Sequence, residues 1–481
     1  MNSKDRRDLL GWLDAEVNRL GCLRLLDSGM ISRVRTDLGG SHTVVTYPPL
    51  DALDPIDPAE ITEAVQPVQG INLYVHIAFC EVLCPFCHYD TAFSNITAKE
   101  SESVWSYLGA LESEIRQWKR LIAGSTAGSL YVGGGTPTAI STGRLLSILH
   151  ALEDIPRAAG FSCCVETSPL TTVAPDGRNK LATIVRAGVD RLSIGIQTFN
   201  TQLLRRSRGY TAETAIEALN ILSSLIDNVN IDMIQDLPDQ TEEHVLDDLD
   251  CIESLRPAQV TWYILRLRPE AAWFSRYNRS ALEISSPIES VRKRMLIREG
   301  MERMGYISRP GGRFVRKDTI RDRFKDIRAG LDSTLLGMGV SAYSHGWGAF
   351  FRNTYSRANI NGIQSYIERI SSGKFAIETG RWIDDVERAA GSLVFGIRTG
   401  VRLPEATIAN QHYIAGAART LERLQGAGLV AVDAEGMHAI TKLGSIFEEE
   451  ICSLFYSRDV EERLVNHAAR ELKLGISTLG V

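Results

Sequence analysis

The stretch that decides the fold is INLYVHIAF, residues 71–79, followed by SYLGALESEIRQWKRLI, residues 106–122, and SLYVGGG, residues 129–135. The first and third segments are short, mostly apolar runs, which are typical of strands buried on both faces. The middle segment repeats apolar residues with the period of an amphipathic helix. Strand, helix and strand in this order predict a βαβ unit with parallel strands.

The same alternation continues to about residue 305. Further strand-like runs are FSCCVETS, RLSIGIQTF, NVNIDMIQDLP and AQVTWYILRLRP, which begin at Phe161, Arg191, Asn228 and Ala258. Six such units predict an α/β fold and fit either an open doubly wound sheet or a partial (β/α) barrel. In both, the chemistry should lie at the C-terminal ends of the strands.

The rest of the chain divides around this core. We expect an N-terminal helix and a proline-rich extended arm over 1–68, the strand–helix core over 69–305, and a barrel-capping segment over 306–380. Residues 381–481 read as helix, glycine turn, short hairpin and helix, the order of a winged-helix-like unit.

Composition excludes several classes of protein. The chain has 481 residues, with 53 Lys and Arg against 59 Asp and Glu, and a formal charge of -6. Collagen-like, coiled-coil and wholly disordered chains are excluded, and the missing basic excess argues against a nucleic-acid partner. No apolar run is long enough to span a membrane, and the charged N-terminus has no signal core, so we expect a cytoplasmic protein without a membrane partner.

The strongest chemical signal is YVHIAFCEVLCPFCHYD, where Cys80, Cys84 and Cys87 form a C-x3-C-x2-C spacing after the first strand. Three thiolates on one loop suit an iron–sulfur cluster or zinc, the latter with His88 as a fourth ligand. Structural zinc sites usually take paired ligands from two separate knuckles, and no second pair exists here. Three cysteines on a cubane cluster would leave one iron open for catalysis. The other five cysteines are expected to be core or surface residues.

Glycines and polar residues follow the other strands. Gly133, Gly134, Gly135 and Thr136 end the second strand, where missing Cβ atoms would let backbone groups approach a ligand, although the run could also be only a tight turn. Each of the later polar residues could be a simple cap or ion pair, but their shared rim favours a site for hydroxyl, ammonium and carboxylate groups. These residues are Glu166, Gln197, Arg208 and Asp232.

Together these motifs resemble the radical S-adenosylmethionine (SAM) superfamily. The segments YVHIAFC, GVDRLSIGIQTFN, IDMIQDLPDQT and GMGVSAYS are similar to the branch of oxygen-independent coproporphyrinogen III oxidase (HemN), from about Leu73 onward. The resemblance implies a TIM-like (β/α)6 barrel, a [4Fe-4S] cluster and two SAM molecules. It also implies an external electron donor of the flavodoxin or ferredoxin type.

The resemblance assigns residues to the cofactors. Cys80, Cys84 and Cys87 would bind the cluster, whose open iron would chelate a SAM that yields a 5′-deoxyadenosyl radical. Tyr74, Gly134 and Glu166 match positions around this first SAM. Positions around the second SAM are matched by Phe86, Gly135, Thr136, Gln197, Arg208 and Asp232, with Arg266 and Tyr343 as looser matches. No general base or other catalytic side chain is implied.

Departures from the family pattern shape the expected reaction. The oxidase has a fourth cysteine two residues after the triad, where this chain has Tyr89. The HNxxYW signature of the related haem chaperones is also absent, which argues against haem trafficking. Ala78 replaces a proline, and Asp236 and Asp239 replace two glycines of the family pattern.

Three functions follow as hypotheses. We expect a two-SAM enzyme, similar to class C radical SAM methyltransferases and cyclopropanases, that transfers a methyl or methylene carbon to an sp2 carbon of a small molecule or peptide. The alternative is porphyrin chemistry, either coproporphyrinogen III oxidation or radical opening of haem. The third is a non-catalytic protein that delivers a tetrapyrrole or a cluster.

Overall fold

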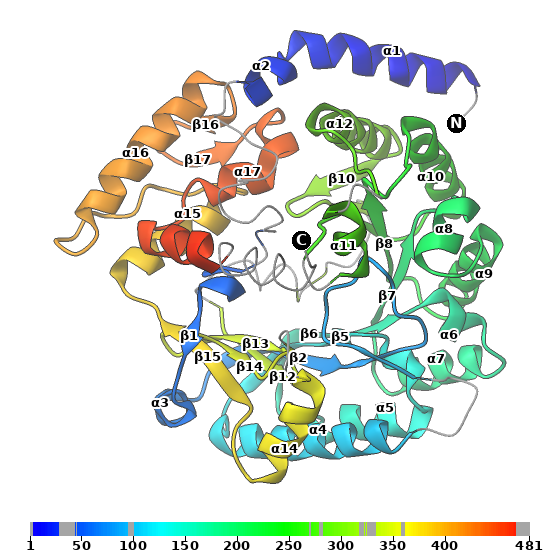
Figure 1. The fold of residues 1–481 in the computed structure, drawn as a ribbon, viewed down its shortest axis with the longest axis vertical. Helices are drawn as coiled ribbons and strands as arrows, with labels where there is room; N and C mark the ends of the chain where they lie inside the picture. Colours follow the sequence, from blue (N-terminus) through cyan, green and yellow to red (C-terminus); the bar gives the residue numbers. More distant parts are fainter. Residues whose placement is uncertain are drawn as a thin grey trace.

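The expected strand–helix repeat forms an open, curved sheet in the computed structural model (Figure 1), which describes residues 3–27, 44, 46–94, 101–268, 271–278, 282–316, 322, 324, 333–356 and 361–467. Within these ranges, thirteen strands make one sheet in the order β1-β15-β14-β13-β12-β2-β5-β6-β7-β8-β9-β11-β10. Its parallel part is β12 (Leu335–Met338), β2 (Gln69–Ile77), β5 (Thr126–Gly134), β6 (Arg157–Thr167), β7 (Arg191–Gln197), β8 (Val229–Gln235) and β9 (Gln259–Ile264). The expected α/β fold class, a partial TIM-like barrel, is confirmed.

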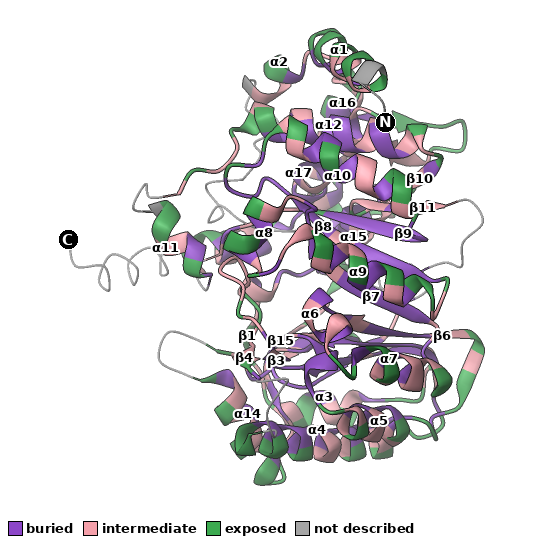
Figure 2. Ribbon diagram, turned by 90° about the vertical axis from the view of Figure 1, so that its right-hand side faces the viewer, coloured by how far each residue is buried: buried purple, intermediate pink, exposed green. Residues whose placement is uncertain are grey.

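Helices cover the outer face of the curved sheet (Figure 1). In Figure 2 the strands are mostly buried, whereas α4, α5 and α7 expose their outward sides. Such one-sided burial is expected of amphipathic helices that cover a parallel sheet. The helices that follow the strands are α4 (Glu102–Leu121), α5 (Thr142–Ala151), α6 (Pro169–Val173), α7 (Gly177–Arg186), α8 (Thr201–Ser207), α9 (Ala212–Ser223), α10 (Glu242–Leu255), α11 (Ala272–Asn278) and α12 (Pro287–Arg303).

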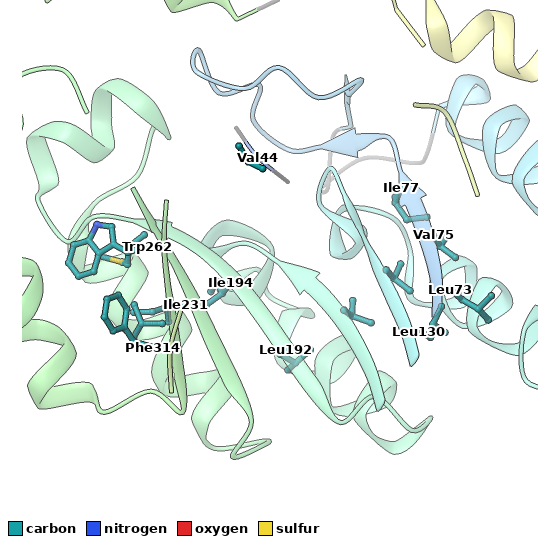
Figure 3. Packing of buried hydrophobic residues seen from close by; sticks show 14 of the residues in the cluster. Val44, Leu73, Val75, Ile77, Leu130, Leu192, Ile194, Ile231, Trp262 and Phe314 are labelled. Atoms are coloured by element: carbon teal, nitrogen blue, oxygen red, sulfur yellow. The ribbon is translucent and has the colours of Figure 1, made fainter. Parts of the chain in front are cut away.

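Alternation along the strands separates an apolar outer face from a polar inner one. Leu192 and Ile194 of β7 and Ile231 of β8 belong to the continuous core that Figure 3 shows along the sheet. The intervening residues, such as Ser193 and Asn230, are buried polar groups that hydrogen-bond to one another (Asn230 Nδ2 to Ser193 Oγ, 2.8 Å). The interior of the barrel is therefore polar enough to hold a site.

Residues 306–380 add strands to the sheet on both sides of its parallel part. Gly311 and Gly312 have φ of 76° and 67°, a left-handed geometry that favours glycine. They turn β10 (Tyr306–Arg309) into β11 (Arg313–Arg316), which pairs antiparallel with β9. On the other side, β13 (Tyr343–Gly346), β14 (Ala349–Asn353) and β15 (Ile377–Trp382) extend the sheet beyond β12, and α14 (Gly362–Ser371) packs on α4. The segment thus lengthens both edges of the sheet.

The N-terminal residues lie on the main body. Helix α1 (Ser3–Arg19) and the short α2 (Cys22–Asp27) pack on α12. After η2 (Leu50–Ala52), strand β1 (Asp54–Pro55) pairs with β15, and α3 (Pro58–Ala64) leads into β2. Val44, Tyr47 and Ala52 of the extended arm are buried in the main core.

The C-terminal residues form a compact helical unit beside the open side of the barrel (Figure 1). Its elements are α15 (Asp385–Gly396), α16 (Gln411–Gly426), the hairpin of β16 (Val430–Val432) and β17 (His438–Ile440), η4 (Gly444–Phe447) and α17 (Glu448–Ser453). Contacts of η4 with α12 bring this unit to the barrel. In the described part of the chain, we find no helix with the length and apolar character needed to cross a membrane.

Candidate functional site

A cavity of about 410 Å³ lies at the C-terminal ends of the parallel strands, where the sequence predicts the site. Its walls come from the cysteine loop, from the strand ends of β5 to β9, from the β10–β11 hairpin and from the C-terminal helical unit. It collects most of the predicted site residues: Cys80, Cys84, Phe86, Cys87, Gly134, Gly135, Thr136, Glu166, Gln197, Arg208, Asp232 and Arg266.

The cysteine loop is held at both ends by a small parallel ladder. Strand β3 (Phe79–Cys80) pairs with β4 (Ala92–Phe93), and the backbone N–H of Ser94 donates to the carbonyl of Cys80 (2.8 Å). Inside the loop, the N–H of Cys87 donates to the carbonyl of Cys84 (3.0 Å). The loop is therefore a closed turn whose three thiols face one cavity.

Burial raises the pKa of Cys80 to about 12 and that of Cys87 to about 11. Thiolates, which are the forms that bind metals, consequently need a cationic partner here. Among the described residues, no three His, Cys, Asp or Glu side chains are gathered closely enough to hold a metal ion. The fit of the triad to an iron–sulfur cluster rests instead on its three soft donors and on the one loop that carries them.

Arg208 contacts this loop. It stands at the end of α8, and its Nη1 donates to Sγ of Cys84 at 2.9 Å, while Nη2 lies 3.4 Å from the carbonyl of Gly195. Its buried Nε has no hydrogen-bond partner in the structure. A guanidinium with an unused donor beside the thiols fits a negatively charged ligand group.

The glycine run serves close packing within the protein. A Cβ on Gly133 would lie 2.7 Å from Oε2 of Glu166, one on Gly134 2.4 Å from Nδ1 of His76, and one on Gly135 2.6 Å from the carbonyl of Phe79. Gly134 also has φ of 102°. The glycines are thus explained by the approach of these groups, and the structure itself requires no ligand to account for them.

Glu166 and Tyr74 have different surroundings. Oε1 of Glu166 accepts from the Tyr131 hydroxyl at 2.6 Å, and Oε2 accepts from the N–H of Gly134 at 3.2 Å. The hydroxyl of Tyr74 is 3.2 Å from Nδ1 of His76, and its ring stacks on Tyr131. Tyr74 and Tyr343 pack against an inner cluster around Tyr131 and do not line the cavity. The structure thus brings Glu166, but neither tyrosine, to the cavity wall.

Asp232 is oriented by a buried polar network. Its Oδ2 accepts from the Ser193 hydroxyl at 3.0 Å, and its Oδ1 accepts from Nδ2 of Asn230 at 2.9 Å. The Thr261 hydroxyl in turn donates to Oδ1 of Asn230 at 2.9 Å. This network fixes the carboxylate of Asp232 at the cavity.

Backbone strain gathers at the same strand ends. Gln197 has φ of 74°, and Asp236 and Asp239, at the positions where the family pattern has glycine, both have φ of 65°. Non-glycine residues in this region cost free energy and persist only where the surroundings hold them. Asp236 is fully buried and accepts a hydrogen bond from the Ser290 hydroxyl. This hydrogen bond helps to hold the left-handed backbone that a glycine would adopt without strain.

Sequence reasoning missed the wall supplied from distant parts of the chain. Arg294, Arg298, Arg309, Glu448 and Glu449 line the cavity beside Trp262 and Tyr263. The run of three glutamates at 448–450 was the one visible signal, because consecutive acidic residues at a helix start need cationic partners when buried. Nothing in the sequence indicated which arginines would meet them.

Comparisons with known proteins define the class. Residues 74–252 match the Radical SAM superfamily, and the expected similarity to the HemN-like branch of that superfamily is confirmed. The chain is an enzyme of this class, and its cofactors are a [4Fe-4S] cluster and SAM.

The chain is similar to particular members over most of its length. It is 27% identical over 427 residues to anaerobic coproporphyrinogen III oxidase 1 of Cereibacter sphaeroides, covering 84% of this chain and 90% of that protein. With the oxygen-independent coproporphyrinogen III oxidase of Escherichia coli it shares 27% identity, covering 81% of this chain and 86% of that one. The solved HemN structure from E. coli superposes with a TM-score of 0.70 at 24% identity, covering 85% and 96% of the two chains, which supports the fold.

A second set of relatives, haem chaperones, includes matches to a shorter part of the chain. The chain is 30% identical to the haem chaperone HemW of Haemophilus influenzae over 201 residues, which are 41% of this chain and 52% of that protein. The match thus spans about half the length of the chaperone.

The expectation of methyl or methylene transfer is wrong. It depended on the absence of one cysteine after the triad, where Tyr89 stands. Coproporphyrinogen III oxidases match 81% and 84% of the chain, and nothing in the comparisons supports carbon transfer. A single loop position proved a weaker guide than similarity across the barrel and the C-terminal unit.

Proposed function

We propose that this protein is a radical SAM enzyme that oxidises a tetrapyrrole, with coproporphyrinogen III as the substrate that the relatives favour. The observation that carries the proposal is the cavity itself. The cysteine loop forms one part of its wall, and Arg266, Arg298 and Arg309 form another. A substrate with several carboxylate side chains suits a cavity whose wall holds several guanidinium groups as well as the cysteine loop.

In this proposal the cavity residues divide between the cofactors. Cys80, Cys84 and Cys87 hold the cluster, and Gly134 and Glu166 hold the SAM at its open iron. A second SAM is held by Phe86, Gly135, Thr136, Gln197, Arg208 and Asp232. The cluster and SAM, once reduced by an external flavodoxin- or ferredoxin-type donor, supply a radical that abstracts hydrogen.

The proposed chemistry is an oxidative decarboxylation. A propionate side chain of the tetrapyrrole loses one hydrogen atom, and the bond to its carboxylate then breaks. The carboxylate leaves as carbon dioxide, one electron passes to an external acceptor, and a vinyl group remains. The arginines serve to hold the carboxylates that do not react, so that one side chain is presented to the radical source.

The test is product analysis under strictly anaerobic conditions. Reconstituted protein is incubated with SAM, a strong reductant, an electron acceptor and coproporphyrinogen III, and the porphyrins are separated and weighed by mass spectrometry. We expect products that have lost one and two carboxyl groups, and none with the Cys84→Ala variant. Coproporphyrinogen III recovered unchanged from protein with a full cluster would overturn the proposal.

A further inference from the structure

An ion pair joins the barrel to the C-terminal unit inside the cavity. Nη2 of Arg266, which follows β9, lies 2.5 Å from Oε2 of Glu449 in α17. Both residues line the cavity, yet their side chains differ in exposure: 7% for Arg266 and 23% for Glu449. Burial alone would raise the pKa of Glu449, but the charge and hydrogen bond of Arg266 lower it below its ordinary value, so Glu449 is present as a carboxylate.

Arg266 has donor capacity left over. Its buried Nε makes no hydrogen bond in the structure. A guanidinium presents five N–H donors in a fixed fork that matches a carboxylate with two parallel bonds. Arg266 could therefore donate two parallel hydrogen bonds to a carboxylate, whereas it donates one to Glu449.

A neighbouring pair offers a comparison. Arg294 binds Glu450 (Nη2 to Oε1, 2.9 Å), and it also donates to the carbonyl of Ile446 (2.5 Å). The Nε of Arg294 lacks a partner as well, but the Glu450 side chain is only 5% exposed. Glu450 is thus enclosed, whereas Glu449 has access to water.

Exchange is physically favourable only for one kind of ligand. Removing a partner from a buried ion pair leaves an uncompensated charge, so a neutral group cannot displace Glu449 without a large penalty. An incoming carboxylate keeps the charge on Arg266 balanced, and the released Glu449 regains hydration. This asymmetry selects for a carboxylate.

We propose that Arg266 is an exchangeable carboxylate site, at which Glu449 holds the place of a carboxylate on an incoming ligand. Two ligands of this site carry that group: the side chains of the substrate and the methionine moiety of SAM. The substrate version rests on the proposed function, and the SAM version does not. Glu449 thereby tunes the affinity for anionic ligands and couples the C-terminal unit to cavity occupancy.

The experiment measures binding without turnover. Cluster-loaded protein without reductant is titrated with coproporphyrin III and with its tetramethyl ester, and binding is followed by the fluorescence of the porphyrin. SAM binding is measured separately by equilibrium dialysis. The variants are Arg266→Met, Glu449→Gln and, as the matched control, Glu450→Gln. Thermal unfolding of each variant verifies folding.

Opposite changes are expected from the two partners. Arg266→Met should weaken the carboxylate ligand about tenfold or more, and Glu449→Gln should tighten it several-fold, because a competitor is removed. The ester should respond to neither variant, and Glu450→Gln in folded protein should change the affinities less than Glu449→Gln does, because the Glu450 side chain is enclosed. A merely structural pair would shift affinity in the same direction for both substitutions.

The titrations with coproporphyrin and with SAM identify which ligand supplies the carboxylate. A response with coproporphyrin assigns the site to the substrate, and a response with SAM assigns it to the cofactor. Wild-type protein that binds no coproporphyrin counts against the proposed function, and the SAM arm then decides the exchange site alone. Folded variants, Glu449→Gln included, that change neither affinity would overturn the inference.

Discussion

Arg208 and Cys84, which lie 124 positions apart, meet at 2.9 Å between Nη1 and Sγ. The contact ties the end of α8 to the cysteine loop and makes the cavity a single unit built from strands far apart in the chain. It therefore places cationic character where a cluster and an anionic ligand group would meet.

Loss of a cysteine from the triad should remove the cluster. We expect Cys84→Ala to lower the iron and sulfide of the anaerobically reconstituted protein to background, since two thiolates cannot retain a cubane cluster firmly. The control is Cys251→Ala, because Cys251 lies on α10 away from the cavity. Full iron in Cys84→Ala, measured by metal analysis, would contradict the assignment of the triad.

The network behind Asp232 should matter for SAM binding. Asn230→Leu removes the donor to Oδ1 of Asp232 and one acceptor of the Thr261 hydroxyl. We expect one of two SAM sites to weaken about tenfold, the cost of a lost buried hydrogen bond. Equilibrium dialysis counts the sites, and Asn228→Leu is the control, because Asn228 accepts from Gln259 instead. Two unchanged sites in Asn230→Leu would argue against a role for Asp232.

The extended arm should contribute to stability through Tyr47. Its hydroxyl donates to Oε2 of Glu387 at 2.5 Å, and both side chains are 1% exposed. Tyr47→Phe withdraws a donor from a buried carboxylate, which costs about 1–3 kcal/mol, so the melting temperature should fall by a few degrees. Tyr277→Phe, at a side chain that is 42% exposed, should melt like wild type. Equal melting of both variants would show that the arm is loosely held.

Glu114 should make stability depend on pH. It accepts from the Tyr366 hydroxyl, the Gly339 N–H and the Asn353 amide, yet burial raises its pKa to about 7 from 4.5. The folded state therefore binds a proton more tightly than the unfolded state. The benefit is complete below pH 4.5 and is lost as the pH rises through 7, by about 3 kcal/mol.

The substitution Glu114→Gln isolates this contribution. The variant loses an acceptor at every pH, but it should no longer lose stability between pH 5 and 7. The gap in melting temperature between wild type and variant should thus narrow as the pH rises. Curves that stay parallel across this range would contradict the raised pKa.

The strands and the cavity position could be predicted from the sequence because both follow local rules. Hydrophobic periodicity and apolar runs indicated the parallel core. The position of Glu166, Arg208 and Asp232 near the strand ends indicated that they would share one cavity. The glycine run was ambiguous, because a missing Cβ makes room equally well for a ligand and for a neighbouring side chain such as the ring of His76.

The remaining features depend on contacts between distant segments. The pairing of Arg266 with Glu449 crosses 183 positions, and no periodicity encodes it. Residues 306–380 add strands to both sides of the parallel sheet. Which edges are available for this pairing is a property of the assembled sheet. The reaction was mispredicted for a related reason: one altered loop position, Tyr89, cannot outweigh a match over most of the chain.

The most direct measurement counts two products together. Anaerobic protein with a full cluster receives SAM and reductant, with or without coproporphyrinogen III, and 5′-deoxyadenosine and carbon dioxide are quantified. The account predicts that deoxyadenosine rises strongly with the tetrapyrrole and matches the carbon dioxide released, one for one. Deoxyadenosine that is indifferent to the tetrapyrrole, with no carbon dioxide formed, would contradict it.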